Sequence, residues 1–209
     1  MQHRRVVATG LGMVCPVGND VATSWEAMLA GRSGIGLITR FDTSGLQCRI
    51  AGEVKAFDVA LYMPPKEARR LDTFIHYGVA ASAQAIKDSG LEISDANRER
   101  IGCVIGSGIG GLPMIEDNHT ELMNRGPRRV SPFLIPGSIS NMIAGTVSIQ
   151  YGLQGPNLAI VTACTTGLHS IGDAGRLIEH DDADVMLAGG SEATGCPLGI
   201  VGVDSRKAH

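Results

Sequence analysis

The sequence predicts an α/β fold in which helices cover a mainly parallel sheet. Short apolar segments alternate with longer helix-compatible segments along the 209 residues, the pattern typical of consecutive βαβ units. The chain has 28 glycines and 4% aromatic residues, a composition that suits close packing between helices and strands. No linker, low-complexity tract or short repeat interrupts the alternation, so we expect one folded unit rather than several.

In the first half of the chain, capping residues and apolar runs delimit the elements. Asn19 or Asp20 precedes a helical segment that Gly31 ends. Asp72 precedes the most regular helical segment, which Gly90 ends. The expected elements, in order, are a buried strand at 6–14, a helix at 21–30, a loop, a short strand at 48–54, a turn with one or two helical turns at 63–72, and a helix at 73–89.

In the second half, apolar strands alternate with helices. The run "GSGIGG" at 106–111 follows one strand, but it lacks the Gly-Lys-Ser/Thr ending of a phosphate-binding loop, so nucleotide binding is not predicted. The expected elements, in order, are a strand at 100–105, a helix at 112–125, an extended loop at 127–138, a helix at 139–151, a strand at 156–163, a helix at 165–181 and a strand at 183–193.

Charge and cysteine content exclude several classes of protein. The net charge of −3 gives no signal for nucleic acid or a membrane surface, and no apolar run reaches the roughly 18 residues of a membrane-spanning helix. The five cysteines are odd in number and widely spaced, with no Cys-x-x-Cys pair and no Cys/His metal pattern. We therefore expect a reduced, cytoplasmic protein that binds no metal, nucleic acid or membrane.

A cysteine stands at the junction of a predicted strand and a predicted helix, in "IVTACTTGLHS" at 160–170. Unpaired N–H groups and the positive end of the helix dipole favour a thiolate at the first turn of a helix. The same N–H groups can receive the oxyanion that forms when a thioester is attacked. The residues alone leave two interpretations open: Cys164 is a nucleophile for covalent acyl transfer, or it is a small buried apolar residue.

The segment "GPNLAIVTACTTGLHSIGDAGRLIEHDDADVMLAGGSEA" resembles the active-site segment of the β-ketoacyl-[acyl carrier protein] synthases. Within that family it is most similar to the chain-elongating type II synthases. The stretches "RRVVATGLGMVCPVGN", "RIGCVIGSGIGG" and "RRVSPFLIP" resemble the same family at consistent spacing. This resemblance, which covers nearly the whole chain, implies that Cys164 is the nucleophile.

The resemblance implies a thiolase-type fold with two βαβαβαββ halves related by a pseudo-twofold axis, of which this chain is the N-terminal half. It implies that acyl carrier protein delivers an acyl group to Cys164 as a thioester. Malonyl on a second carrier protein then loses CO2, and the resulting carbanion attacks that thioester. In the family, two histidines and a lysine of the second half complete this machinery, and no cofactor is required.

The resemblance also assigns residues to an acyl pocket. Ile109 corresponds to the gate residue at the mouth of that pocket. Phe133 and Leu134 fall in a segment that lines the same tunnel, partly across the interface of a homodimer. Ordinary packing in a core or an interface is the alternative for all three residues.

Two basic clusters interrupt an otherwise acidic sequence. Lys66, Arg69 and Arg70 share one helical face because they are spaced i, i+3 and i+4. Arg128 and Arg129, with Arg125 nearby, form the second cluster. A solvated charged face is the alternative, but the resemblance places both clusters where acyl carrier protein docks, and such a patch can steer an acidic partner.

Residues 1–202 follow the family pattern, whereas the tail at 203–209 does not, and nothing corresponds to the second half of the family. His169 follows Cys164 by five positions, which diverge by about 140° on a helix, so we expect an ordinary packing or surface role for His169. Three interpretations stay open: a fatty-acid chain-elongating synthase, a polyketide-type ketosynthase, and an inactive fragment or dimerisation partner.

Overall fold

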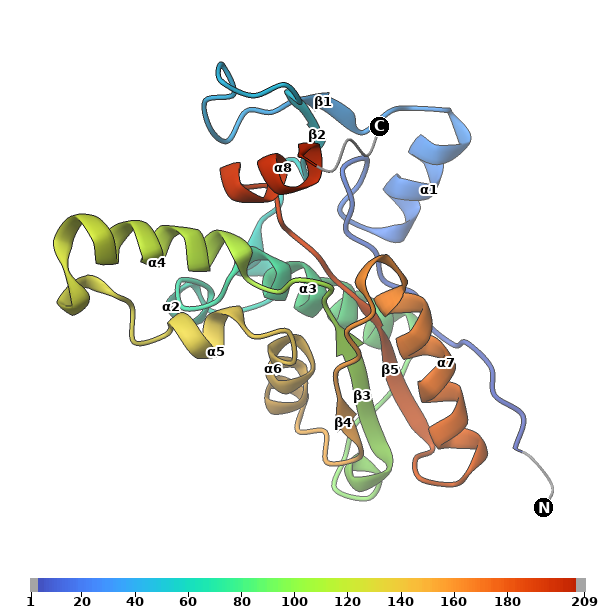
Figure 1. Cartoon of the computed structure of the whole chain (residues 1–209). Helices are drawn as coiled ribbons and strands as arrows, with labels where there is room; N and C mark the ends of the chain where they lie inside the picture. Colours follow the sequence, from blue (N-terminus) through green and yellow to red (C-terminus); the bar gives the residue numbers. More distant parts are fainter. Residues whose placement is uncertain (1–3, 206–209) are drawn as a thin grey trace.

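A three-stranded parallel sheet forms the centre of the computed structural model, which describes residues 4–205 (Figure 1). β3 (Ile101–Gly106) lies between β4 (Asn157–Leu158) and β5 (Val185–Gly190), and both neighbours run parallel to it. All six residues of β3 are buried, as expected for a strand whose two faces are both covered. The predicted α/β fold with a mainly parallel sheet is therefore confirmed.

Three helices cover this sheet. α7 (Thr166–Glu179) packs along β3 and β5, and in Figure 1 it lies in front of the sheet. α3 (Thr73–Ser89) passes behind the sheet and packs against α6 (Met142–Tyr151), which also contacts β3. The largest fully buried side chains come from these elements, so one core holds them together; they are Phe74, Ile75, Val79, Ile101, Val104, Ile143 and Val147.

The helix that the sequence predicts most clearly, α3, is capped as expected. The side chain of Asp72 accepts a hydrogen bond from the N–H of Phe74, and Gly90 ends the helix with a left-handed φ of 66°. The other carboxylate oxygen of Asp72 accepts the N–H of Met114, near the start of α4 (Leu112–Arg125), at 2.9 Å. Burial raises the pKa of Asp72, although both N–H groups favour the ionised carboxylate. This one buried side chain therefore joins two helix starts.

The strand predicted at 6–14 is not formed. A strand needs a neighbouring backbone, and here the N–H groups of Leu11 and Met13 donate instead to side chains of α3, Asp88 and Gln84. A cavity of about 600 Å³ separates this segment from β5. The segment consequently runs across α3 without joining the sheet, and Val7 is 63% exposed.

Several smaller elements differ from the sequence prediction. The strand predicted at 48–54 is present but pairs with an unpredicted strand, and the strand predicted at 156–163 is paired over two residues only. The loop predicted at 127–138 contains helical turns.

The remaining elements are α1 (Val21–Leu29), β1 (Ile35–Leu37), β2 (Ile50–Gly52), η1 (Val59–Leu61), α2 (Pro65–Ala68), η2 (Arg98–Arg100), η3 (Pro127–Arg129), α5 (Leu134–Ser138), η4 (Ala163–Thr165) and α8 (Pro197–Asp204).

α8 crosses the position at which the sequence departs from the family pattern. It begins at Pro197 and continues to Asp204, so residues 203–204 of the expected tail are helical. Residues 206–209 of that tail lie outside the described residues. Between residues 4 and 205, no helix is both long enough and apolar enough to cross a membrane.

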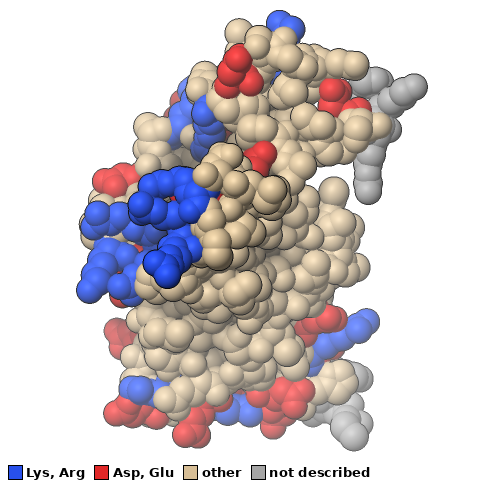
Figure 2. All heavy atoms as spheres, turned by 60° about the vertical axis from the view of Figure 1, so that its left-hand side comes forward, with Lys and Arg blue, Asp and Glu red and all other residues tan. Residues whose placement is uncertain are grey.

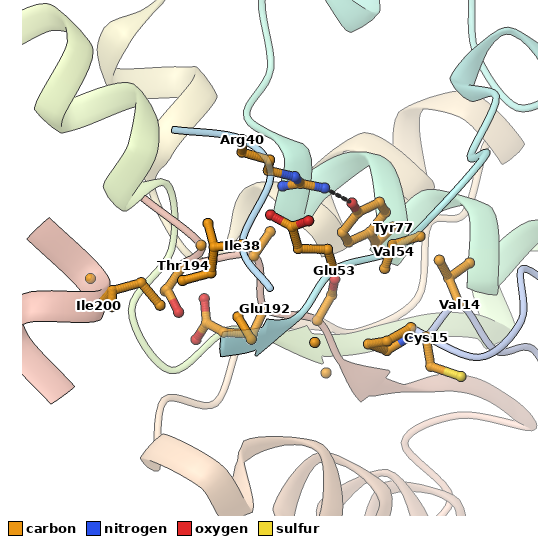
Figure 3. A pocket seen from close by; sticks show the side chains of 18 of the residues that line it. Val14, Cys15, Ile38, Arg40, Glu53, Val54, Tyr77, Glu192, Thr194 and Ile200 are labelled. Carbon is orange, nitrogen blue, oxygen red and sulfur yellow. Dashed lines mark hydrogen bonds between the residues drawn. The ribbon is translucent and has the colours of Figure 1, made fainter. Parts of the chain in front are cut away.

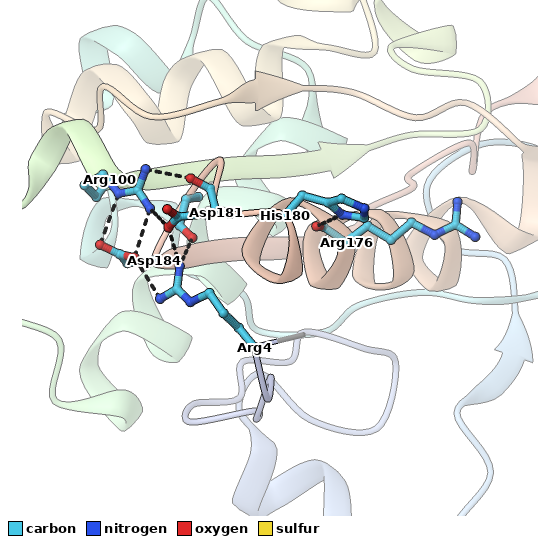
Figure 4. Close-up of polar contacts among 7 residues, drawn as sticks. Arg4, Arg100, Arg176, His180, Asp181 and Asp184 are labelled. Carbon is cyan, nitrogen blue, oxygen red and sulfur yellow. Dashed lines mark hydrogen bonds and ion pairs between the residues drawn. The ribbon is translucent and has the colours of Figure 1, made fainter. Parts of the chain in front are cut away.

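An exposed ion-pair network ties the N-terminal segment to the start of the sheet (Figure 4). Arg100 contacts Asp181 at 2.6 Å and Asp184 at 3.0 Å, and Arg4 contacts the same two carboxylates at 2.9 and 2.8 Å. Hydrogen bonds from Arg100, and then from Arg4, lower the pKa of Asp184 to about 2. The network thus joins three segments that are distant in sequence.

We predict that Asp184→Asn removes an acid-sensitive part of the stability. An aspartate in an unfolded chain has a pKa of about 3.9. Because folding lowers the pKa of Asp184, its contribution is fully present above about pH 4 and is lost as the pH falls toward about 2. Thermal melts between pH 2 and 6 should therefore show a lower Tm for the variant at pH 6 and a smaller fall below pH 4.

The matched control is Asp173→Asn, which removes the same charge from a looser pair with Arg176 at 3.7 Å. This control should follow the wild-type pH profile. Parallel profiles for the wild type and Asp184→Asn would contradict the prediction.

Candidate functional site

Cys164 lies on a short turn at the carboxyl edge of the sheet. The turn, η4, connects the chain after β4 to α7. It lies at the edge of the sheet where β3 and β5 end. Parallel strands place their carboxyl ends at one edge, the common position of functional residues in such sheets. Cys164 is exposed there, so the interpretation of this residue as a buried apolar side chain is wrong.

The residue before Cys164 has a strained backbone. Ala163 has a φ of 54°, in the left-handed region that residues with a side chain adopt at a cost of about 1–2 kcal/mol. The flanking turn compensates for this cost through hydrogen bonds. The carbonyl of Thr162 accepts the N–H of Thr165 at 3.2 Å and its hydroxyl at 2.7 Å, and the N–H of Thr162 donates to the hydroxyl of Thr166 at 3.0 Å.

Two glycines let this turn approach the sheet closely. A Cβ at Gly106, the last residue of β3, would lie 1.9 Å from the carbonyl oxygen of Ile160. A Cβ at Gly190, the last residue of β5, would lie 3.0 Å from the Cα of Gly167 in α7. Since both contacts are with backbone atoms, no side-chain movement could relieve them. The position of the Cys164 turn is therefore set by backbone-to-backbone packing.

Glu192 organises the glycine loop beside the turn. Its carboxylate accepts the hydroxyl of Ser107 at 3.1 Å and the N–H of Ile109 at 3.0 Å. The hydroxyl of Ser107 also accepts the N–H of Gly110 at 3.0 Å. Glu192 is not among the candidate residues predicted from the sequence, although its place two residues after β5, in "GGSEA", was the available signal.

Of the three residues assigned to an acyl pocket, Ile109 is the one whose N–H donates to Glu192, and its side chain is 57% exposed. Phe133 and Leu134 are half-buried, and Leu134 begins α5, which packs on α4 and α6. The guanidinium of Arg70 lies 4.4 Å from the centre of the Phe133 ring. A role in an acyl pocket stays a prediction for all three.

The structure brings the two basic clusters onto one side of the molecule. Figure 2 shows Lys and Arg side chains gathered there. Arg70 joins the clusters, because it follows α2 and stacks on Phe133, which follows η3. Within residues 4–205, the members predicted to dock a carrier protein form no ion pair; they are Lys66, Arg69, Arg70, Arg128 and Arg129. Arg125, by contrast, pairs with Glu121 at 3.0 Å.

A separate cavity of about 540 Å³ lies between α3, the β1–β2 hairpin and the chain that follows β5 (Figure 3). Arg40 donates to the hydroxyl of Tyr77 at 3.1 Å on its wall. Burial would raise the pKa of Glu53, but hydrogen bonds from Thr39 lower it overall. Glu192 lines this cavity, whereas Cys164 does not. Among the described residues, no group of three metal-ligating side chains comes together.

The other cysteines differ from Cys164 in their surroundings. Burial raises the pKa of Cys103 to about 12 and that of Cys196 to about 11. Both thiols are therefore protonated at neutral pH and are poor nucleophiles. Cys15 and Cys48 are partly buried, which leaves Cys164 as the exposed cysteine among residues 4–205.

The chain is similar in sequence to known proteins of one family. The chain matches the family described as "Beta-ketoacyl synthase, N-terminal domain" over residues 3–209. Over its full length it is 57% identical to the 3-oxoacyl-[acyl-carrier-protein] synthase 2 of Vibrio cholerae serotype O1, of which it covers 50%. It is 55% identical, over 97% of its length, to the protein of that name from Coxiella burnetii, of which it covers 49%. The chain thus spans about half the length of these curated relatives.

Solved ketosynthase structures have the same fold. The ishigamide ketosynthase/chain length factor matches with a TM-score of 0.86 at 27% identity, over 99% of this chain and 52% of that one. A type II PKS acyl-carrier protein in complex with its ketosynthase bound to the hexaketide matches with a TM-score of 0.81 at 28% identity, over 97% of this chain and 55% of that one. These similarities confirm the predicted N-terminal ketosynthase fold.

We predict that Gly106→Ala destabilises the fold and displaces the Cys164 turn. The new Cβ would overlap the carbonyl of Ile160, and such overpacking typically costs about 1–3 kcal/mol. Urea unfolding should show this loss of stability. Gly189→Ala is the matched control, because a Cβ at that position has no heavy atom within 4 Å. Equal stability of the two variants would rule out backbone packing as the constraint on the turn.

Proposed function

The chain belongs to the β-ketoacyl synthase family, and we propose that it carries the acyl-accepting half of a 3-oxoacyl-[acyl carrier protein] synthase of type II fatty-acid elongation. The observation that carries this proposal is the exposed Cys164 on a strained turn at the start of α7. The pattern of a nucleophile on a tight turn before a helix suits covalent acyl transfer. The high identity to two bacterial synthases supports the fatty-acid assignment.

In the proposed step, the thiolate of Cys164 attacks the carbonyl carbon of an acyl thioester on acyl carrier protein. A new C–S bond forms to Cys164, and the C–S bond to the carrier breaks. The carrier leaves as a thiolate and takes up the proton that the Cys164 thiol has lost, so no oxidant, metal or cofactor is consumed. The N–H of Cys164, at the amino end of α7, is proposed as one donor to the oxyanion.

The condensation step is proposed only for a polypeptide that also supplies the other half of these relatives. Loss of CO2 from a malonyl thioester and attack by the carbanion need acid–base groups beside the cysteine. Among the described residues, His169 is the histidine nearest in sequence to Cys164, and its Nδ1 already bonds to Thr162. The division at residue 202 likewise stays a proposal, as does a cytoplasmic location.

The joined basic clusters are the proposed docking surface for acyl carrier protein. The exposed members are free to meet an acidic partner, since none of them forms an ion pair within residues 4–205. A ketosynthase relative has been solved in complex with a type II PKS acyl-carrier protein. That relative also keeps the polyketide alternative open, but at 28% identity it is more distant than the synthases of 55–57% identity.

A second candidate function is association without activity of its own. Large apolar side chains are exposed on α6, α7 and α8, and examples are Ile149 at 81% and Leu168 at 73%. A surface of this kind is typical of a protein that pairs with a second polypeptide or with a second copy of itself. We therefore propose a dimer, and sedimentation of the purified chain distinguishes it from a monodisperse monomer.

We predict that an acyl-carrier-protein thioester transfers one acyl group to the wild type but not to Cys164→Ala. Intact-mass spectrometry measures the addition directly, and Cys48→Ala is the matched control because it removes a partly buried thiol elsewhere. Transfer to Cys164→Ala would contradict Cys164 as the acceptor. No transfer to the wild type or to Cys48→Ala would contradict acyl acceptance by this chain.

We also predict that Arg69→Glu weakens carrier-protein binding by about tenfold. The substitution places a repulsive charge within the proposed docking surface, and loss of a close charge pair that contributes about 1.4 kcal/mol weakens binding about tenfold. Isothermal titration with acyl carrier protein measures the affinity. Arg176→Glu on α7 makes the same charge change away from the surface and should bind like the wild type. Equal losses in both variants would show that only net charge matters.

A further inference from the structure

Every polar group of Thr162 is bonded either to Thr165, the last residue of η4, or to the first turn of α7. Its carbonyl and N–H bond to Thr165 and Thr166, as described above. Its hydroxyl Oγ1 lies 2.7 Å from Nδ1 of His169. From these contacts we infer that His169 is a positioning residue that holds the Cys164 turn through the hydroxyl of Thr162.

The spacing explains why these contacts converge. Thr166 and His169 are three positions apart in α7, the spacing that brings two side chains to one face of a helix, and Thr165 directly precedes Thr166. Thr162 is the residue directly before the strained Ala163, and Cys164 comes next. Thr165, Thr166 and His169 therefore fix the backbone on the amino-terminal side of Ala163 and Cys164.

His169 does not bond to the cysteine itself. Among the described residues, the one hydrogen bond of its ring is to Thr162, and no hydrogen bond joins the ring to Cys164. This agrees with the angular separation that the sequence predicts for the two residues. The ring is also exposed, so its orientation is set by this bond and not by surrounding packing. Of the packing and surface roles expected for His169, the structure shows a surface position, and that position alone does not account for the 2.7 Å contact.

The Thr162–His169 bond has a consequence for reactivity. A left-handed Ala163 returns to ordinary backbone regions when the contacts that hold it are removed. In those conformations the thiol of Cys164 is no longer held at the amino end of α7. Removing the imidazole should therefore lower the fraction of molecules in which Cys164 is correctly presented. One typical hydrogen bond shifts such an equilibrium by about fivefold.

The test measures the alkylation rate of Cys164 by iodoacetamide, resolved by peptide mass spectrometry, with Cys48 as the internal reference. His169→Phe keeps a ring and removes the nitrogen, whereas His169→Asn keeps a polar atom near the position of Nδ1. Thr162→Val removes the hydroxyl and keeps the shape. We expect His169→Phe and Thr162→Val each to lower the Cys164 rate by about fivefold, and His169→Asn to restore it to within about twofold of the wild type.

The double variant Thr162→Val/His169→Phe should lose no more than either single variant, because both remove the same bond. Unchanged rates in both single variants, losses that multiply in the double variant, or no rescue by His169→Asn would each overturn the inference. Thermal melts identify any variant that fails to fold, and Thr162→Val then tests the bond without altering α7.

The inference deepens the proposed function but can be tested apart from it. Alkylation needs no carrier protein and no acyl group. The expected alkylation pattern together with no acyl transfer to the wild type would reject the proposed function and retain the positioning role of His169. Normal acyl transfer with unchanged alkylation in His169→Phe would reject the positioning role alone.

Discussion

The packing of the Cys164 turn directly onto the backbone of the sheet is the constraint on which the site depends. Gly106 and Gly190, at the ends of β3 and β5, have no side chains, so the chain before the turn and the start of α7 can approach them closely. The turn contains the strained Ala163, and hydrogen bonds around Thr162 hold the turn in this conformation. The thiol is thus exposed and yet placed by backbone geometry, a combination that loops without such support do not provide.

The same constraint connects the site to the core and to the basic surface. β3 is buried along its length, and the loop that follows it is tied by Glu192 to the chain after β5. On the other side of that loop, buried Asp72 joins the starts of α3 and α4. Arg70, two residues before Asp72, stacks on Phe133 within the proposed docking surface. A short series of contacts therefore links the Cys164 turn to the surface where a carrier protein is proposed to bind.

Much of this arrangement could be predicted from the sequence, because its signals are local. Asp72 and Gly90 mark the ends of α3, and the pattern "IVTACTTG" predicts the position of Cys164 just before a helix. What the sequence could not predict depends on distant partners. Residues 6–14 have the pattern of a strand, but their N–H groups bind side chains of α3. The contact between His169 and Thr162 depends on a turn whose φ values no local pattern reveals.

The most direct test of how the turn presents Cys164 compares the alkylation rates of all five cysteines of the wild type, folded and in urea, by peptide-resolved mass spectrometry. Cys164 should react fastest in the folded protein, ahead of the partly buried Cys15 and Cys48, and the buried Cys103 and Cys196 should be protected. These differences should disappear on unfolding. A folded protein in which Cys164 reacts no faster than Cys15 and Cys48 would contradict the central claim that the turn presents this thiol for reaction.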